Sequence, residues 1–385
     1  MKVAVLKERR RYEARVAATP DTVKKLIGLG LEVVVEAGAG AGASIADSAY
    51  EAAGAKIEGD LAAALKGAGI VLKVQRPLAG KDGDVDELAL IDKGAVLIGL
   101  LAPYSGDHVA AYAAAGITSF SLEFVPRITR AQSMDVLSSQ ANLAGYKAVI
   151  DASSAFGRAF PMMMTAAGTI APARVLVMGV GVAGLQAIAT ARRLGAVVSA
   201  TDVRLATKEQ VQSLGASFVA VENEETKQAE TSGGYAKEMS DEYKKLQAEL
   251  IQATIQKMDI VICTALIPGR KAPTLVTEAM VKSMKPGSVI VDLAVEQGGN
   301  CELSQFAKTV TKHGVTIIGP ANLPAEIAVD ASMLFSKNVL NFVTPLIDKD
   351  TKSLKIDGED AIVKGSLLTQ NGQIVHPSLV AKPGE

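Results

Sequence analysis

The stretch Val175-Leu176-Val177-Met178-Gly179-Val180-Gly181-Val182-Ala183-Gly184 decides the fold of this 385-residue chain. Its four leading apolar residues are typical of a buried strand, and they run directly into a Gly-x-Gly-x-x-Gly turn that opens a helical stretch. The next apolar run covers residues 196–201 and ends at Asp202. A strand, a glycine turn, a helix, a second strand and an acidic residue in this order predict a dinucleotide-binding Rossmann unit.

Each residue of this pattern has a physical role toward a dinucleotide. Gly179 allows a tight turn, Gly181 lets the backbone approach a pyrophosphate, and Gly184 lets the helix pack close to the strand. The start of the helix offers unpaired N–H groups and a positive dipole end to the phosphates. Asp202 lies eighteen positions after Gly184, where it can bind the adenosine ribose and repel a 2′-phosphate. The pattern favours NAD over NADP, although Arg204 weakens that preference.

Composition limits the class of protein. The chain is 49% hydrophobic but only 4% aromatic, which suits parallel sheets packed between helices. The net charge of −1 implies neither a nucleic-acid partner nor an anionic membrane surface. Cys263 and Cys301 are isolated thiols without metal-ligand spacing, and the charged N-terminus lacks a signal-peptide core, so we expect a reduced, cytosolic protein without a metal. The apolar run 175–191 is explained by a strand, turn and helix, and no direct membrane insertion is expected.

The organisation of the chain predicts an α/β protein with two doubly wound, parallel-sheet, Rossmann-like domains joined by long helices. The joining helices are expected at 134–160 and 328–346. The first domain would comprise residues 1–137 plus 330–385, and the dinucleotide-binding domain residues 138–329.

Apolar periodicity predicts the individual elements. In the first domain we expect strands at 3–6, 32–36, 70–74, 95–100 and 117–122, and helices at 21–29, 47–53, 61–66, 85–91 and 107–115. In the second domain we expect strands at 174–178, 196–201, 217–221, 259–263, 287–292 and 315–318. The C-terminal region predicts short antiparallel strands at 354–356, 361–364, 366–369 and 373–375, with Asn371-Gly372 as a hairpin turn.

The segment 222–240 interrupts the regular alternation. It is charged and contains Ser232-Gly233-Gly234-Tyr235. A glycine pair beside a single tyrosine suggests a flap that lays an aromatic ring over a ligand, because long loops are commonly functional or disordered. A solvated insertion is the alternative.

The residues that could carry chemistry are few. His108, His313 and His376 lie in polar contexts and are expected to be solvated, and no Ser-His-Asp, HExxH or CxxC arrangement occurs. Four polar residues instead stand in an apolar setting before the first joining helix, where a cleft is expected, and could hold a carboxamide: Arg127, Gln132, Asp135 and Ser138. The alternative is that Ser133-Met134-Asp135 is simply a capped helix start.

Several long stretches carry a family resemblance. Residues 127–135 (Arg-Ile-Thr-Arg-Ala-Gln-Ser-Met-Asp) and 137–146 (Leu-Ser-Ser-Gln-Ala-Asn-Leu-Ala-Gly-Tyr) are very similar to the NAD(H)-binding component of proton-translocating nicotinamide nucleotide transhydrogenase. So are residues 161–169, the glycine fingerprint with Leu185-Gln186-Ala187, and residues 233–239. The resemblance extends from Lys7-Glu8 to Val375-His376-Pro377 and so covers nearly the whole chain.

This resemblance implies residue roles. Arg127, Asp135 and Ser138 would orient the nicotinamide of NADH, and Gln132 would contact the opposing nicotinamide of NADP(H) on a partner component. The Tyr235 loop would close over the site. The implied cofactor contacts are Gly179, Val180, Gly181, Val182, Ala183, Gly184, Asp202, Val203, Arg204, Gly234, Tyr235, Ala265 and Leu266.

The resemblance also implies an assembly. The chain would be a homodimeric, soluble subunit that works with NADP(H)-binding and membrane-spanning transhydrogenase subunits. It would then lie peripherally on the cytoplasmic face of the inner membrane.

Alanine dehydrogenases are related to this family and provide the main alternative. They share an early arginine, here Arg15, and carry a substrate-binding lysine at a position that aligns with Gln75, although Lys73 is close. Their catalytic histidine falls in the segment matching 97–102, which holds no histidine here. Transhydrogenation needs neither group, because hydride passes directly between two nicotinamide rings. A non-catalytic NAD sensor is a further alternative, against which the complete set of Arg127, Gln132, Asp135 and Ser138 argues.

Overall fold

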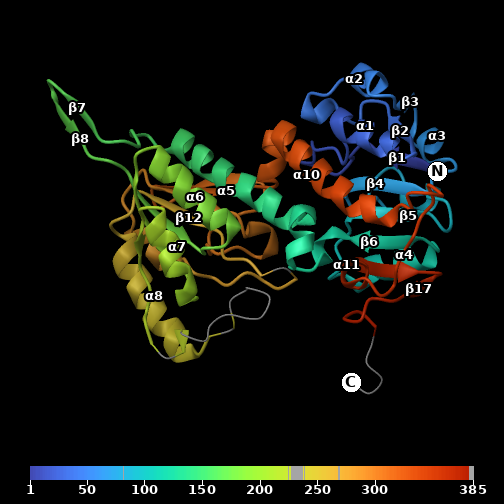
Figure 1. Cartoon of the computed structure of the whole chain (residues 1–385). Helices are drawn as coiled ribbons and strands as arrows, with labels where there is room; N and C mark the ends of the chain where they lie inside the picture. Colours follow the sequence, from blue (N-terminus) through green and yellow to red (C-terminus); the bar gives the residue numbers. More distant parts are fainter. Residues whose placement is uncertain (81, 224, 227–236, 238, 268, 381–385) are drawn as a thin grey trace. The chain divides into compact units, whose positions relative to one another are not determined.

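The computed structural model describes residues 1–80, 82–223, 225–226, 237, 239–267 and 269–380. The chain divides into two compact units, one made of Met1–Gln140 with Ala325–Glu385 and the other of Ala141–Pro324. The sequence pattern predicts the two crossings after residues 137 and 329, so each differs from the structure by a few residues. Figure 1 shows the elements of both units.

The first unit is built on an eight-stranded sheet in the order β17-β16-β6-β5-β4-β1-β2-β3. Its six strands from the N-terminal region pair in parallel, and β16 and β17 add an antiparallel edge. The strands are β1 (Lys2–Val5), β2 (Glu32–Glu36), β3 (Lys56–Glu58), β4 (Ile70–Gln75), β5 (Val96–Leu100), β6 (Thr118–Ser121), β16 (Leu367–Gln370) and β17 (Gln373–Ile374). The helices are α1 (Pro20–Gly28), α2 (Asp47–Ala52), α3 (Leu61–Leu65), α4 (Gly106–Ala114), α10 (Ala328–Val343) and α11 (Ala361–Ser366).

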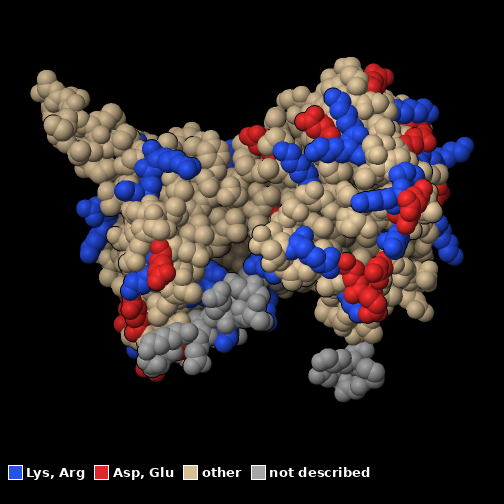
Figure 2. All heavy atoms as spheres, in the orientation of Figure 1, with Lys and Arg blue, Asp and Glu red and all other residues tan. Residues whose placement is uncertain are grey.

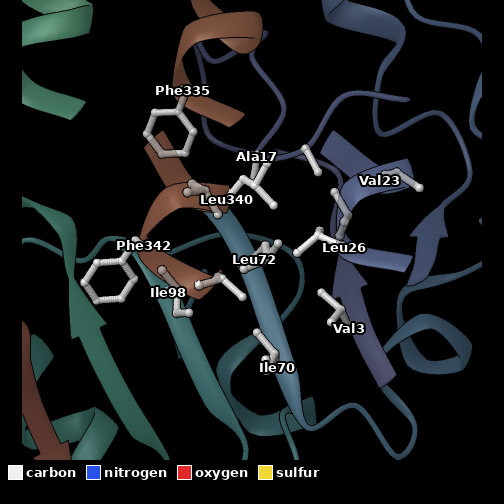
Figure 3. Close-up of a cluster of buried hydrophobic side chains, with 14 of the residues drawn as sticks. Val3, Ala17, Val23, Leu26, Ile70, Leu72, Ile98, Phe335, Leu340 and Phe342 are labelled. Atoms are coloured by element: carbon white, nitrogen blue, oxygen red, sulfur yellow. The ribbon is translucent and has the colours of Figure 1, made fainter. Parts of the chain in front are cut away.

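Alternation along these strands gives the first unit two cores. Val3 and Val5 of β1 point to one face of the sheet, where α1 and α10 pack. Ala4 points to the other, where α3 and α4 pack. Figure 3 shows the first of these cores, with Leu72 and Ile98 facing Leu340. A sheet covered on both faces explains why its strands are continuously apolar.

The second unit is built on a seven-stranded sheet in the order β11-β10-β9-β12-β13-β15-β14. All neighbours pair in parallel except β14, which runs antiparallel to β15 at the edge. The strands are β9 (Arg174–Met178), β10 (Val197–Thr201), β11 (Ser217–Phe218), β12 (Ile260–Cys263), β13 (Val289–Asp292), β14 (Lys308–Lys312) and β15 (Val315–Gly319). The helices are α5 (Val136–Ala155), which begins in the first unit, and α6 (Val182–Arg193), α7 (Lys208–Ser213), α8 (Asp241–Ile255) and α9 (Glu278–Ser283).

The second sheet is also covered on both faces. Val175 and Val177 of β9 pack with residues of α5, α6 and α7. Leu176 and Met178 pack with residues of α8 and α9. The predicted fold class, α/β with parallel-rich, Rossmann-like sheets, is therefore confirmed for both units.

Three predicted elements are wrong. The segment 85–91 forms a single 3₁₀ turn, Leu88–Leu90, rather than a helix, because the buried Glu87 carboxylate binds Lys73 and the N–H of Leu78. Residues 361–364 begin a helix, since the side chain of Asp360 caps its first turn. Residues 354–356 contribute only one bridge, between Ile347 and Leu354. The hairpin turn is confirmed: Asn371 and Gly372 have φ of 52° and 77°, as a type I′ turn requires.

A short hairpin of β7 (Met163–Thr165) and β8 (Gly168–Ile170) belongs to the second unit and was not expected from the sequence pattern. It extends away from the sheet of its unit (Figure 1). Its side chains are exposed, with Met164 at 77%, and the adjoining Met162 is exposed at 59%. Figure 2 shows mixed charges over much of the visible surface and none on this hairpin. It is therefore an apolar surface outside any core.

Across the described residues, no helix combines the length and apolar character needed to cross a membrane.

Candidate functional site

The topology of the second sheet determines where a ligand would bind. From β9 the chain first moves outward to β10 and β11, and then returns to the other side of β9 to form β12. At such a reversal the loops that leave the two central strands diverge, and ligands of open α/β sheets bind outside these carboxyl ends. The loops in question follow Met178 and Cys263.

The glycine turn after β9 is shaped by close packing at two of its three glycines. Gly179 has a φ of 96°, and a Cβ there would lie 2.9 Å from the Ala265 nitrogen. A Cβ at Gly184 would overlap the carbonyl oxygen of Gly179. In contrast, a Cβ at Gly181 would meet nothing within 4 Å. Gly179 and Gly184 are thus required by the fold, whereas Gly181 leaves a bare face of backbone.

Helix α6 begins at this bare face. Gly181 is its N-cap residue, and no side chain caps the helix. The N–H groups of a first turn have no partner within the helix, so they remain available to an anion. The backbone of α5 also lies close, since a Cβ at Gly145 would overlap the carbonyl oxygen of Ala183. The arrangement fits a pyrophosphate group, as the sequence motif predicts.

Asp202 follows β10 and is only 8% exposed. One carboxylate oxygen accepts from the Val180 N–H at 2.7 Å and from Nη2 of Arg204 at 2.7 Å. The other accepts from the Arg204 N–H at 2.8 Å and from Arg204 Nε at 2.9 Å. Both oxygens are therefore occupied twice, and a ribose hydroxyl can bind only if one donor leaves. The Arg204 side chain is the donor that can swing away, because the other two are backbone groups.

The loop after β12 is tied to the glycine turn. Thr264 donates its hydroxyl to the carbonyl oxygen of Gly179 at 2.8 Å, and Ala265 donates its N–H to Asn300 at 3.0 Å. Leu266 remains 37% exposed. The sequence pattern missed Thr264, Asn300 and Gly145, because their contacts join segments far apart in the chain. The Gly298-Gly299 pair before Asn300 is the one local signal.

The four polar residues expected to orient a nicotinamide lie in the first unit. Arg127 and Gln132 are exposed, in a segment that forms a 3₁₀ turn at Thr129–Met134. Asp135 accepts from the Ser138 N–H at 2.8 Å and from the Ser138 hydroxyl at 2.6 Å. The interpretation of Asp135 as a helix cap is thus confirmed. Its carboxylate and the Ser138 hydroxyl form one hydrogen-bonded pair at the start of α5.

Two contacts hold this segment in place within the first unit. Asn338 and Asn341 of α10 donate to the carbonyl oxygen of Ser133 at 2.8 and 3.1 Å. Arg130 binds both carboxylate oxygens of Asp360. Gln132 therefore projects from a firmly anchored turn.

Other predicted contacts differ in what can be described. Val203 packs with Met239 and Tyr243 beside Asp202. Val182 is exposed at the start of α6. Gly234 and Tyr235 lie outside the described residues.

The residues that would mark an amino-acid dehydrogenase are occupied by internal partners. Arg15 is 3% exposed and binds both oxygens of Glu13 and the side chain of Gln140. Gln75 donates to the same Glu13 carboxylate at 3.1 Å. Lys73 is 1% exposed and binds both oxygens of Glu87. An added carboxylic acid would have to displace Glu13 to reach Arg15.

The histidines are less solvated than expected. His376 packs its ring 4.7 Å from that of Phe124, and burial lowers its pKa. His313 binds Glu278. Burial also lowers the pKa of His108. Within the described ranges, no three His, Cys, Asp or Glu side chains gather as metal ligands.

Comparison with known proteins defines the class to which this fold and site belong. The family described as "Alanine dehydrogenase/PNT, N-terminal domain" matches residues 4–144, and "Alanine dehydrogenase/PNT, C-terminal domain" matches residues 148–377. The chain belongs to this family.

Individual relatives are more specific. The chain is similar to the first of the two chains that make up NAD(P) transhydrogenase subunit alpha in Rhodospirillum rubrum, with 60% identity over 383 residues, 99% of this chain and 100% of the relative. It is similar to the crystal structure of transhydrogenase from Sinorhizobium meliloti, with a TM-score of 0.87 and 52% identity over 97% of this chain and 100% of that one. An L-alanine dehydrogenase structure aligns with a TM-score of 0.81 and 27% identity over 98% of each chain.

Proposed function

We propose that this chain is the NAD(H)-binding subunit of a membrane-bound, proton-translocating transhydrogenase, and that hydride passes directly from its NADH to NADP+ held on a partner component. The observation that carries the proposal is the uncapped start of α6 at Gly181, where a Cβ would meet nothing within 4 Å. Similarity to transhydrogenase alpha subunits over nearly the whole chain supports it.

The second unit would bind the nucleotide. The N–H groups of Val182, Ala183 and Gly184 would hold the pyrophosphate, and Asp202 would accept from the adenosine ribose. A 2′-phosphate would place a second negative charge against Asp202, so NADH is the expected ligand rather than NADPH. Val203, Arg204, Ala265, Leu266, Gly234 and Tyr235 are proposed as further contacts.

The turn at residues 127–138 would position the reacting ring. NADH supplies the hydride from C4 of its nicotinamide. Arg127 and the Asp135–Ser138 pair would orient the carboxamide, and Gln132 would contact the opposing nicotinamide. No residue of this chain has to move a substrate proton, which agrees with the absence of a histidine from segment 97–102.

The partners follow from this role. We propose NADP(H)-binding and membrane-spanning subunits as partners, with this subunit placed peripherally on the cytoplasmic face of the membrane. We also propose a homodimer, and the exposed, uncharged β7–β8 hairpin is the surface that best suits a contact between copies.

An alanine dehydrogenase is the alternative that the fold allows. The Glu13 carboxylate on Arg15 argues against it, because a keto acid would need that guanidinium. Gln75, at the position of the substrate-binding lysine, donates to the same carboxylate.

Stopped-flow hydride transfer after addition of a purified NADP(H)-binding component tests the proposal. Gln132→Asn should leave NADH affinity within twofold of wild type and slow hydride transfer about 100-fold, because small misplacements of reacting groups are costly. Ser133→Ala is the matched control, since it changes the neighbouring side chain and keeps the carbonyl that α10 binds. A wild-type rate in Gln132→Asn would contradict the role of Gln132. Absence of NADH binding by the wild-type chain would contradict the proposed function.

A further inference from the structure

Asn300 is a buried amide in the second unit that the proposed function does not use. It lies eight positions after Asp292, at the end of β13, and its exposed fraction is 0%. Burial of an amide is costly unless its donors and acceptor find partners. Its partners are therefore informative about why an amide stands here.

The side chain of Asn300 binds the backbone of the loop that follows β12. Its Oδ1 accepts from the Ala265 N–H at 3.0 Å, and its Nδ2 donates to the Ala265 carbonyl at 2.9 Å. The same Nδ2 donates to the Pro273 carbonyl at 2.8 Å. One N–H and two carbonyls define the amide orientation, since the reversed amide would face an N–H with its NH₂ group and two carbonyls with its oxygen.

Asn300 is itself fixed by Asp292. The fully buried Asp292 carboxylate accepts from the N–H groups of Ala294, Asn300 and Cys301 at 3.0, 3.2 and 2.9 Å. It also accepts from the hydroxyl of Ser304 at 2.7 Å. The carbonyl of Asn300 is used as well, by the N–H of Val276 at 2.9 Å. The amide thus projects from a backbone that has little freedom to move.

The loop that Asn300 holds is in direct contact with the glycine turn. The N–H of Thr264 donates to the carbonyl of Met178 at 2.8 Å, and its hydroxyl donates to Gly179. The turn at Gly179 comes so close to Ala265 that no Cβ fits between them. A shift of Ala265 would therefore be felt at the backbone that faces the pyrophosphate.

We propose that Asn300 is a positioning residue that sets the Ala265–Leu266 backbone as one wall of the dinucleotide site before NADH binds. The inference rests on the proposed function. Asn300 touches no substrate in this scheme and acts through Ala265 alone. A wall fixed in advance spares the cost of ordering the loop upon binding.

Asn300→Asp is the sharpest variant, because it keeps the volume and the acceptor and replaces the donor with an oxygen facing two carbonyls. Ser304→Ala is the matched control, since it removes a hydrogen bond to Asp292 in the same buried loop without touching Ala265. Calorimetric titration with NADH and a thermal melt would be run on both variants and on wild type. We expect Asn300→Asp to raise the NADH Kd at least tenfold and Ser304→Ala to leave it within twofold.

The outcomes separate the inference from the proposed function. If wild type binds NADH and Asn300→Asp binds it equally well, or if both variants lose affinity alike, Asn300 has no positioning role. If wild type itself does not bind NADH, the proposed function is wrong.

A measurement on wild type guards against a variant that fails to fold. Hydrogen exchange at the Ala265 amide should already be slow without nucleotide, because the amide is bound to Asn300 beforehand. Fast exchange that slows only when NADH is added would overturn the inference.

Discussion

The two units reverse their strand order at corresponding places and use those places differently. In the first sheet the reversal lies between β1 and β4, and in the second between β9 and β12. The residues after β1 and along β4 fill the first position with charged groups: Glu8, Arg9 and Lys73, bound to Glu36 and Glu87. Glu13, Arg15 and Gln75 complete this network. In the second sheet glycines leave backbone N–H groups open.

The comparison shows that fold alone does not determine a binding site. Both sheets offer the same topological position for a ligand. In the first unit, side-chain carboxylates occupy the cations that an anionic ligand would need. In the second unit, small residues keep the helix start accessible. The following predictions test this difference.

The largest expected effect concerns the ion pairs of the first unit. Glu13→Ala leaves the buried Arg15 guanidinium without its carboxylate, and breaking a buried pair in this way costs about 3–5 kcal/mol. Burial alone would raise the pKa of Glu13, but its bonds to Arg15 outweigh this and lower it. Denaturant unfolding measures the loss, and the NADH Kd should stay within twofold of wild type. Glu359→Ala, which removes an exposed partner of Lys364, is the control and should cost little. A large loss of NADH affinity in Glu13→Ala would contradict the separation of roles.

A second effect comes from Glu8 in the same network. Burial raises its pKa to about 7 from 4.5, and the attraction of Lys73 only partly offsets this. One of its oxygens has no hydrogen-bond partner among the described residues. Because the folded state favours the protonated form, this stability is complete below pH 4.5 and is lost as pH rises through 7.

Glu8→Gln should remove this dependence on pH. Wild type should lose about 3 kcal/mol relative to the variant between acid and alkaline conditions, since each pKa unit is worth about 1.4 kcal/mol. Urea unfolding at pH 5, 6, 7 and 8 measures the difference. Parallel curves for the two proteins would show that Glu8 is ionised in the folded state.

The third effect concerns nucleotide choice in the second unit. Asp202→Ala should weaken NADH binding by roughly 1–3 kcal/mol, as expected for lost hydrogen bonds to a charged group. It should also improve NADPH binding, because Arg204 is released from its pairing with Asp202. Titration with both nucleotides measures the change, and Arg204→Ala is the control that should not gain NADPH. Unchanged NADH affinity in Asp202→Ala would remove the ribose assignment.

The smallest effect is the most specific to the open site. Gly181→Ala should leave the melting temperature unchanged, since its Cβ meets nothing within 4 Å. The added methyl group should nevertheless weaken NADH binding about tenfold, or about 1.4 kcal/mol. Gly157→Ala, a second glycine with free space around it, is the control. Wild-type affinity in Gly181→Ala would mean that the phosphates lie elsewhere.

Sequence patterns predicted those features of the molecule that depend on local chemistry. The period of the apolar residues identified the parallel strands, and the fingerprint identified the turn, the helix start and the buried acid at Asp202. Asn371-Gly372 predicted its hairpin because only certain residues adopt the left-handed region. These features are written within a few neighbouring residues.

Features that depend on distant partners could not be predicted in this way. The pairing of Arg204 with Asp202 needs side-chain geometry, and the bond of Asn300 to Ala265 joins residues 35 positions apart. Glu87 prevented a helix at 85–91 through contacts with Lys73 and Leu78. The helix at Ala361–Ser366 depended on its Asp360 cap, which outweighed a weak strand pattern.

Transfer of an isotope label tests the central claim most directly. The purified chain would be mixed with an NADP(H)-binding component, NADP+ and NADH deuterated at the transferable C4 position, and the products examined by mass spectrometry. The account predicts that the deuterium appears in NADPH and that the chain alone forms no NADH from NAD+ and alanine. Loss of the label to water, or alanine-dependent formation of NADH by the isolated chain, would contradict it.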